Sequence, residues 1–191
     1  MQRQNRLEEA LKWYQNAIHF RPKLVLAHLN YGLTLNALGA KEKAVKVLKH
    51  IESIDDDGLK DPKTHLRTQV TALLNAGKLL VELGRASEAV TLLRKAEKRG
   101  QVVNYQAQGI LNVLGEALQA LNKTQEAEMS FKQALKVKPD HVPAYLTYGK
   151  LLAKNVRRVV FLLVVAKRRT HMFWQFSPKL HTLDGIDFKS E

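Results

Sequence analysis

A fixed spacing between glycines and alanines constrains the fold of this chain more than any other feature. Three glycines, each on a segment expected to be helical, are followed twelve residues later by an alanine. Self-similarity at a period of about 34 residues is typical of stacked helix-turn-helix units, in which each unit buries its apolar face against its neighbours. The pairs are Gly32 and Ala44, Gly77 and Ala89, and Gly115 and Ala127, whereas Gly149 is followed at this distance by Phe161.

Large and small residues around the glycines repeat with the same spacing. In one unit they are Leu111, Leu114 and Leu118 beside Gly115, then Ala127, Phe131 and Ala134 on the following helix. This arrangement resembles the tetratricopeptide repeat, which sets small residues where paired helices touch. We expect each glycine to face its alanine, because a bulky residue there would overpack the contact between the two backbones. The predicted fold class is therefore all-α, a solenoid of antiparallel helix pairs with an irregular C-terminal tail.

The predicted array covers residues 1–155. The N-terminal helix of the array corresponds to the second helix of a pair, and it has no upstream partner to pack against. We therefore expect this chain to be a fragment with sequence missing before Met1. A non-repeat tail, expected to be poorly ordered, follows over residues 156–191. Within the array, the predicted boundaries are a half repeat at 7–22, repeats at about 25–54, 62–99 and 104–138, and one further first helix at 142–154.

An insertion, DDDGLKDPKTH, separates two of the predicted repeats and lengthens the interval between their glycines to 45 residues. Asp61 followed by Pro62 predicts a helix start, because aspartate caps helix N-termini and proline suits the first helical position. Gly100, at the far end of the same repeat, predicts a helix C-terminus. The acidic residues of the insertion also allow a calcium interpretation. Their spacing lacks the glutamate of an EF-hand loop, so a solvated acidic turn is the favoured interpretation.

The predicted tail contains an apolar run over residues 159–166 between basic residues. The run is rich in valine, which favours strands over helices. One interpretation is an anchor at an anionic membrane surface, since the run is too short to span a bilayer. The favoured interpretation is a non-native sequence that replaces the next second helix.

Charge is the main compositional signal, because the 191 residues carry a net charge of +13. The cations fall largely on the predicted second helices, toward C-termini where they suit the helix dipole. Nucleic-acid binding is not expected, because aromatic side chains are not interleaved with them. The absence of cysteine excludes disulfides and thiolate metal sites. No apolar run is long enough to predict a membrane-spanning helix.

The sequence predicts neither catalytic residues nor a metal site, and no cofactor is expected in this chain. The seven histidines are scattered and lack the paired spacing of a zinc-binding helix. No phosphate-binding loop or nucleophile elbow occurs in the chain. A binding function is therefore favoured over an enzymatic one for these residues.

Tetratricopeptide arrays bind an extended peptide or a helix on the concave face that their first helices line, and the resemblance implies such a groove here. Asparagine can both donate to and accept from a peptide backbone, and lysine can hold a carboxylate. A merely solvated surface is the alternative. The family's two-carboxylate clamp is not expected, because Leu29 and Leu33 occupy its positions. The expected groove residues are Asn30, Asn75, Lys78, Asn112, Glu116, Lys150 and Lys154.

A narrower resemblance lies in the insertion and the repeats that follow it. The stretches IDDDGLKDPKTH, LLNAGKLLVELGR, LNVLGEALQALNKTQEAE and HVPAYLTYGKLLA are similar to the transmembrane and tetratricopeptide repeat-containing family. Members of that family are endoplasmic-reticulum proteins with an N-terminal multispanning part and a lumenal repeat array. They are linked to O-mannosylation of cadherin-type domains, with dolichyl-phosphate mannose as the donor. The family's acidic catalytic residues belong to the membrane part, so none is carried over to this chain.

The resemblance implies a protein-binding segment of an endoplasmic-reticulum O-mannosyltransferase that holds an acceptor or partner protein. The positive charge would suit acidic acceptors of the cadherin type. The alternative is a stand-alone soluble scaffold in the cytoplasm that binds a peptide in its groove. Asn122, in the sequon Asn122-Lys123-Thr124, is a possible N-glycosylation site between two helices, and an occupied site would require the lumen.

Overall fold

The computed structural model describes residues 2–55 and 61–156, and all of the regular structure in this part is helical. The chain forms two compact units, residues 1–149 and residues 150–191. A helix also covers residues 142–156. The helices of the first unit are α1 (Gln2–Phe20), α2 (Val25–Ala37), α3 (Lys41–His50), α4 (Pro62–Glu82), α5 (Ala86–Val103), α6 (Ala107–Ala120) and α7 (Thr124–Val137), with a 3₁₀ turn, η1, at Ile51–Ser53.

The all-α class is confirmed by these elements. Two other expectations lie outside the described residues. One is the tail predicted over residues 156–191, beyond Val156, with its apolar run. The other is the calcium interpretation, because residues 56–60 of the insertion are not described.

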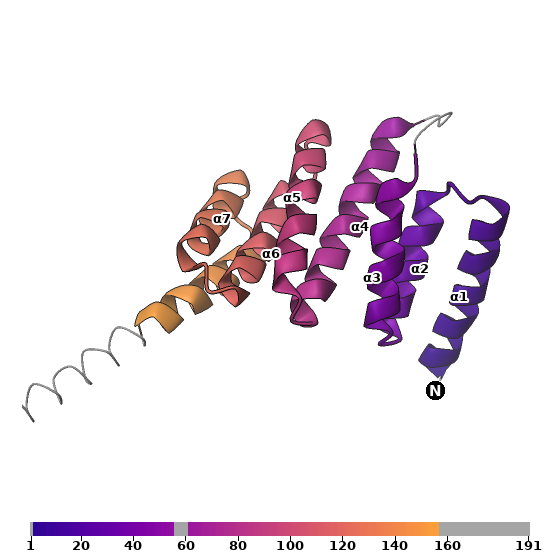
Figure 1. Ribbon diagram of the computed structural model, residues 1–191, viewed down its shortest axis with the longest axis horizontal. Coiled ribbons are helices and arrows are strands. Elements are labelled where there is room, and N and C mark those ends of the chain that lie inside the picture. The colour runs from indigo at the N-terminus through magenta and orange to yellow at the C-terminus, as the bar shows by residue number, and fades with distance from the viewer. Residues whose placement is uncertain (1, 56–60, 157–191) are drawn as a thin grey trace, which may run out of the picture. The chain divides into compact units, whose positions relative to one another are not determined.

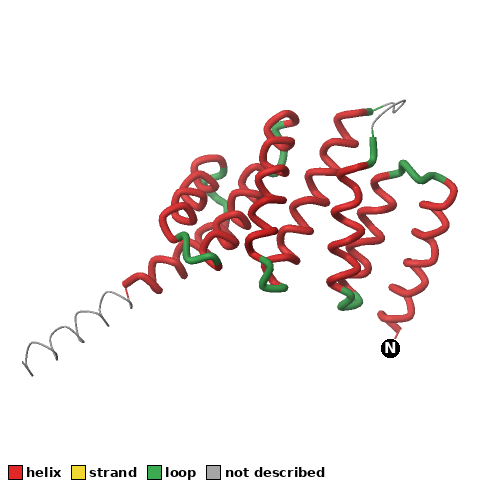
Figure 2. The backbone as a smooth tube through the Cα atoms, in the orientation of Figure 1, coloured by secondary structure: helices red, strands yellow, loops and turns green. Residues whose placement is uncertain are grey.

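The helices of the first unit are arranged in two layers. Figures 1 and 2 show them following one another in chain order as antiparallel neighbours. The first helices α2, α4 and α6 contact one another in succession, α2 against α4 and α4 against α6. Among the described elements, the Cα traces of α1, α3, α5 and α7 come close to first helices, and that of α3 also to η1, but not to one another. We call α2, α4 and α6 the inner layer, since neighbouring repeats come closest there.

The three glycines make room for a large side chain rather than for the alanine twelve residues on, which corrects the expectation from the sequence. A Cβ atom on Gly32 would lie 2.7 Å from Leu48, and one on Gly77 would lie 2.6 Å from Leu93. In each case the partner is sixteen residues after the glycine, one helical turn beyond the alanine. The alanines are fully buried nearby. They fill the core without being the groups that the glycines face.

The turns within each helix pair share one backbone conformation. Gly39, Gly84 and Asn122 each have a positive φ, of 81°, 74° and 60°. The next residue donates its N–H to a carbonyl five residues back, which is the 6→1 bond of a Schellman motif. Asparagine tolerates this left-handed conformation better than any other residue except glycine. Asn122 therefore stands where the other two pairs have glycine.

The insertion lengthens both helices of one pair at the same end. α4 has 21 residues, against 13 in α2 and 14 in α6. The predicted start of α4 is confirmed, because the Asp61 carboxylate accepts a hydrogen bond from the Thr64 N–H at 3.1 Å. α5 continues to Val103 and is capped by left-handed Asn104, so the helix end predicted at Gly100 is wrong. Gly100 is required for another reason: its Cβ position lies 2.8 Å from the Tyr105 carbonyl oxygen.

Several cations of the outer layer form ion pairs between successive repeats. Lys49 on α3 pairs with Glu88 on α5 at 2.6 Å, and Lys95 on α5 reaches back to Glu52 at 3.2 Å. The hydrogen bond from Lys49, with a further one from Arg85, holds the pKa of Glu88 below its usual 4.5. The position of these cations on second helices therefore reflects pairing across repeats as well as the helix dipole.

Candidate functional site

The inner layer presents a row of polar side chains along α4. They recur every three or four residues and so lie on one face of the helix. None of them is fully buried. We call this row the inner polar stripe, and it consists of Lys63, Arg67, Thr71, Asn75 and Lys78.

Two of the expected groove residues, Asn75 and Lys78, belong to the inner polar stripe. Asn75 donates one hydrogen bond from Nδ2 to the Thr71 carbonyl, at 2.8 Å. Its Oδ1 and the exposed Lys78 ammonium have no hydrogen-bond partner or ion pair in the part of the chain that the structure describes. Asn30 holds the same place relative to Gly32 that Asn75 holds relative to Gly77, and it is half-buried. Asn30, Asn75 and Lys78 thus lie on first helices and are not fully buried.

Asn112 and Glu116 differ from the expectation of side chains open to a ligand. Asn112 is only 5% exposed. Its Nδ2 donates to Glu116 at 2.9 Å, and its Oδ1 accepts from the Thr147 hydroxyl at 2.6 Å. Asn112 lies three residues before its glycine, a position that Leu29 occupies in the first complete repeat and that faces the core. The Asn112 amide thus connects α6 to the helix over residues 142–156.

The remaining predicted residues are exposed. Lys150 and Lys154 lie on the helix over residues 142–156 and belong to the second unit, so they are described by themselves. Asn122 is exposed in its left-handed turn, and Thr124 of the sequon begins α7. An exposed turn of this kind leaves the Asn122 amide accessible to a modifying enzyme.

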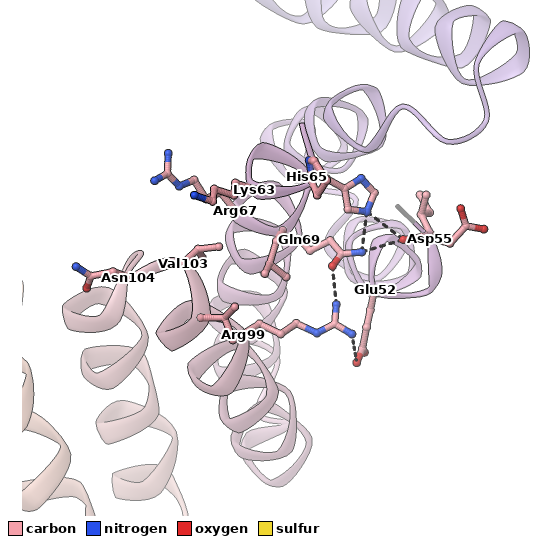
Figure 3. Close-up of a pocket in the computed structure, with 13 residues that line it drawn as sticks. Glu52, Asp55, Lys63, His65, Arg67, Gln69, Arg99, Val103 and Asn104 are labelled. Carbon is pink, nitrogen blue, oxygen red and sulfur yellow. Dashed lines mark hydrogen bonds and ion pairs between the residues drawn. The ribbon is translucent and has the colours of Figure 1, made fainter. Parts of the chain in front are cut away.

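A cavity of about 580 Å³ lies at the insertion end of the first unit, and sequence reasoning missed it. Figure 3 shows the residues that line it, which we call the insertion pocket. They come from η1 and the residues after it, from the first two turns of α4, and from the end of α5. The lining residues are Glu52, Ile54, Asp55, Pro62, Lys63, His65, Leu66, Arg67, Gln69, Arg99, Val102, Val103 and Asn104.

A buried amide organises one side of the insertion pocket. Gln69 is 6% exposed and accepts a hydrogen bond at Oε1 from Arg99 Nη1, at 2.7 Å. Because a guanidinium can only donate, this contact fixes which end of the amide is oxygen. Gln69 Nε2 then donates to the Ile51 and Ile54 carbonyls, at 3.2 Å and 2.9 Å. Arg99 is held on its other side by Glu52, 3.4 Å away.

His65, which is 5% exposed, lies against this amide. Its Nε2 is 3.0 Å from Gln69 Nε2 and 3.1 Å from the Ile54 carbonyl oxygen, so the ring joins the same network. The other ring nitrogen, Nδ1, is buried without a hydrogen-bond partner among the described atoms. A second, mainly apolar cavity of about 540 Å³ also reaches His65 from the α1–α2 turn.

The other side of the insertion pocket is basic. Lys63 and Arg67 are exposed and extend to the same side of α4, as Figure 3 shows. Arg67 lies over the Tyr105 ring, 5.8 Å from its centroid. Hydrogen bonds from Gln106 and Thr71, with the charge of Arg67, lower the pKa of Tyr105 from 10.0 against the effect of burial. Neither cation has a carboxylate within ion-pair distance among the residues described.

The sequence contained one signal for this pocket. His65 and Gln69 are polar residues four apart, on the side of α4 that the helical period assigns to the core. Polar side chains at such positions need partners. The identity of those partners, however, depends on how α3, α4 and α5 pack together.

In residues 2–55 and 61–156, no helix is both long and apolar enough to cross a bilayer.

Comparison with known repeats defines the class of protein. The family model described as "TPR repeat" matches residues 3–39, and the one described as "Tetratricopeptide repeat" matches residues 70–99 and 109–141. Together the matches cover about half of the chain, which belongs to the tetratricopeptide repeat family. The solved MamA fragment from Desulfovibrio magneticus RS-1 has the same fold, with a TM-score of 0.63 at 15% identity over 90% of this chain and 88% of MamA.

A second solved structure is YrrB, described as a TPR protein with an unusual peptide-binding site. It has a TM-score of 0.55 at 19% identity, over 81% of this chain and 72% of YrrB. At this identity the likeness concerns the fold alone.

The particular relatives are protein O-mannosyl-transferases. Protein O-mannosyl-transferase TMTC2 of Mus musculus is 40% identical over 120 residues, and the human protein is 39% identical over 117 residues. The resemblance to the transmembrane and tetratricopeptide repeat-containing family is thereby confirmed. The aligned part is 63% of this chain and only 14% of the mouse protein. The chain therefore corresponds to a repeat segment within much longer relatives.

Proposed function

We propose that this array is the partner-binding segment of an endoplasmic-reticulum protein O-mannosyltransferase. The identity of 40% to mouse TMTC2 supports the link to that enzyme class. In the full-length protein, a membrane-embedded part would carry the active site and use dolichyl-phosphate mannose as donor substrate. The array would then hold the acceptor protein near that site. The tetratricopeptide fold suits this role, because its inner layer offers an extended surface to a protein or peptide.

The observation that carries the proposal is the inner polar stripe of α4. Asn75 and Lys78 offer an acceptor and a cation that no described residue uses, on the layer where successive repeats meet. An extended peptide satisfies such groups through its own N–H and carboxylate oxygens. The net charge of +13 favours an acidic partner, and a calcium-binding cadherin-type domain is the acceptor that we propose.

A binding measurement with a stripe variant tests this proposal. We expect the 191-residue chain to bind a cadherin-type domain, and the double variant Asn75→Ala/Lys78→Ala to weaken that binding by about tenfold. Binding should also weaken as salt rises, because exposed charges are screened. The matched control is Gln133→Ala/Lys43→Ala, which removes one exposed amide and one exposed lysine of the outer layer and so changes the net charge by the same amount. Equal losses in both variants would contradict a role for the inner layer.

The proposed location of the array is the lumen of the endoplasmic reticulum. The exposed Asn122 then becomes a substrate for N-glycosylation, and a glycosidase-sensitive mass that disappears in Asn122→Gln is the expected result. The alternative, a cytoplasmic scaffold, predicts no glycan at this residue. Fractionation of the native protein into cytosol, with Asn122 unmodified, would contradict the lumenal proposal.

A further inference from the structure

We propose that this chain associates head to tail, with α1 of one copy docking on the helix over residues 142–156 of another copy. The surface that receives α1 consists of Val142, Tyr145, Leu146 and Gly149, which all belong to the first unit, and we call it the docking face. The occupant is thus a second copy of this chain. The inference does not rest on the proposed function, because it uses neither the inner polar stripe nor an acceptor protein.

The docking face is exposed where its counterparts in the array are buried. Tyr145 and Leu146 lie four and three residues before Gly149 and are 55% and 60% exposed. Six residues hold the same two places before the three earlier glycines of the array, and none is more than 7% exposed. They are His28 and Leu29, Leu73 and Leu74, and Leu111 and Asn112. Apolar side chains left exposed together in this way mark an interaction surface.

Gly149 makes an empty notch in the docking face. A Cβ atom there would have no described atom within 4 Å, whereas one on Gly32 would lie 2.7 Å from Leu48 and 3.6 Å from Val47 of its second helix. In each complete pair, the notch is filled by the large residue that lies four positions after the buried alanine of the second helix. The docking face therefore fits a helix in which a large side chain follows an alanine at this spacing.

α1 carries this spacing, and in the described part of the chain it is a second helix without a first helix. Ala10, Tyr14 and Ala17 have the spacing of the alanine, phenylalanine and alanine that are fully buried on α7. On α1 all three are only half-buried. Trp13, one residue before Tyr14, is 66% exposed. Because the corresponding two residues of α3 approach their glycine, Trp13 and Tyr14 are the side chains that would enter the Gly149 notch. Tryptophan and tyrosine commonly anchor protein interfaces.

Docking of this kind continues the stacking that already joins the repeats. Within the chain a second helix such as α5 lies against its own first helix, α4, and against the next one, α6, and α4 also lies against α6. In the complex, α1 of the second copy takes the place of a second helix, and α2 of that copy takes the place of the next first helix. The two surfaces differ, so the contact is heterologous and adds further copies in a row instead of closing as a symmetric dimer.

Charge complementarity supports the same register. Lys49 pairs with Glu88 at 2.6 Å, and these residues lie five positions after the alanine of α3 and one position before the alanine of α5. Lys132 of α7 and Glu9 of α1 hold the same two positions. Lys132 pairs with Glu128 at 2.8 Å, and its ammonium has further N–H donors for Glu9 of the next copy. This pair would specify the register, since an exposed ion pair adds little affinity.

Analytical ultracentrifugation of the 191-residue chain tests the inference at concentrations from about 1 to about 200 µM. A salt concentration of about 0.3 M screens the repulsion between copies that each carry a net charge of +13. We expect the average mass to rise with concentration beyond that of a dimer. Tyr14→Glu, which blocks α1, and Gly149→Leu, which fills the notch, should each weaken association by at least about tenfold.

A mixture of the two variants distinguishes this arrangement from a symmetric one. Tyr14→Glu keeps an intact docking face and Gly149→Leu keeps an intact α1, so the mixture should form a one-to-one dimer that grows no further. Lys12→Gln is the matched control, because it changes the net charge as Tyr14→Glu does at an exposed residue of α1. It should associate like the parent. Trp13→Gln, at a side chain that is already exposed, should weaken association by about three- to tenfold without loss of the folded helix.

Three outcomes would overturn the inference. One is a parent chain that stays monomeric over the whole concentration range. The second is a dimer formed by Tyr14→Glu alone or by Gly149→Leu alone, which would mean that two identical surfaces pair. The third is a mixture of these variants that stays monomeric. Binding of a cadherin-type domain, and its loss in Asn75→Ala/Lys78→Ala, is measured on other residues, so the proposed function stands or fails separately.

Discussion

Gly115 determines how close α6 and α7 can come, because a Cβ atom there would lie 2.5 Å from the Phe131 ring. The same relation holds for Gly32 and Gly77 with their leucines. The positions of these glycines, and the fold that they indicate, could be predicted from sequence spacing. Their contact partners could not, because alanine and the large residue one turn later lie on the same helical face. Only the relative placement of the two helices decides which of them the glycine meets.

Gly115→Ala tests this packing. The new methyl group overlaps Phe131, which is fully buried, so we expect the free energy of unfolding to fall by about 1–3 kcal/mol. Adding Phe131→Leu should recover part of the loss, because the smaller side chain leaves space for the methyl group. Gly149→Ala is the control, since its Cβ position has no atom within 4 Å. Chemical denaturation measures all three, and a destabilised Gly149→Ala with an unaffected Gly115→Ala would contradict the account.

His141 makes the stability of the folded array depend on pH. Burial first, then the positive charges of Lys138 and Lys78, lower the pKa of His141 from 6.5, while Asp140 acts in the opposite direction. The unfolded chain therefore takes up this proton more readily than the folded one. Its contribution to stability is complete above pH 6.5 and is lost as the pH falls below that value toward the folded pKa.

We expect His141→Gln to reduce the loss of melting temperature between about pH 7.5 and about pH 5.5 relative to the parent chain. Thermal unfolding at both pH values measures the difference. His19→Gln, an exposed histidine on α1, is the matched control and should leave the pH dependence unchanged. An identical pH dependence in the parent and His141→Gln would exclude this residue as the source.

At the scale of the elements, the insertion is the feature that sets this array apart. Its helix start at Asp61 and Pro62 follows from local rules and could be predicted. The end of α5 could not, because Gly100 resembles a helix stop but serves the close approach of the Tyr105 carbonyl. The hydrogen-bond network around Gln69 could not be predicted either, because the partners of Gln69 come from η1 and α5. Local rules describe helix ends, whereas the pocket depends on contacts between distant segments.

Gln69→Leu tests the network. The substitution removes the Gln69 hydrogen bonds to the Ile51 and Ile54 carbonyls and to the Arg99 guanidinium. We expect the free energy of unfolding to fall by about 1–3 kcal/mol, as measured by chemical denaturation. The exposed Gln133→Leu on α7 should change it by no more than about 0.5 kcal/mol. A neutral Gln69→Leu would mean that the network contributes nothing to the insertion end.

At the scale of the whole molecule, the outer and inner layers carry different kinds of polar groups. The outer layer carries ion pairs such as Lys49 with Glu88, which join successive repeats. Exposed pairs of this kind add little stability individually. The inner layer carries polar groups that no described residue satisfies, and there we place the partner. The array and its inner face could be predicted from the sequence. Which inner residues are open could not, because Asn112 differs from Asn75 by one position relative to its glycine.

The most direct test of the binding surface is site-specific photo-crosslinking in the full-length protein within cells. A photoreactive residue replaces Lys78 on the inner layer or Thr91, an exposed residue of α5 on the outer layer. The account predicts adducts with an acidic acceptor protein at position 78 and none at position 91. Adducts with the acceptor at position 91 alone would contradict it.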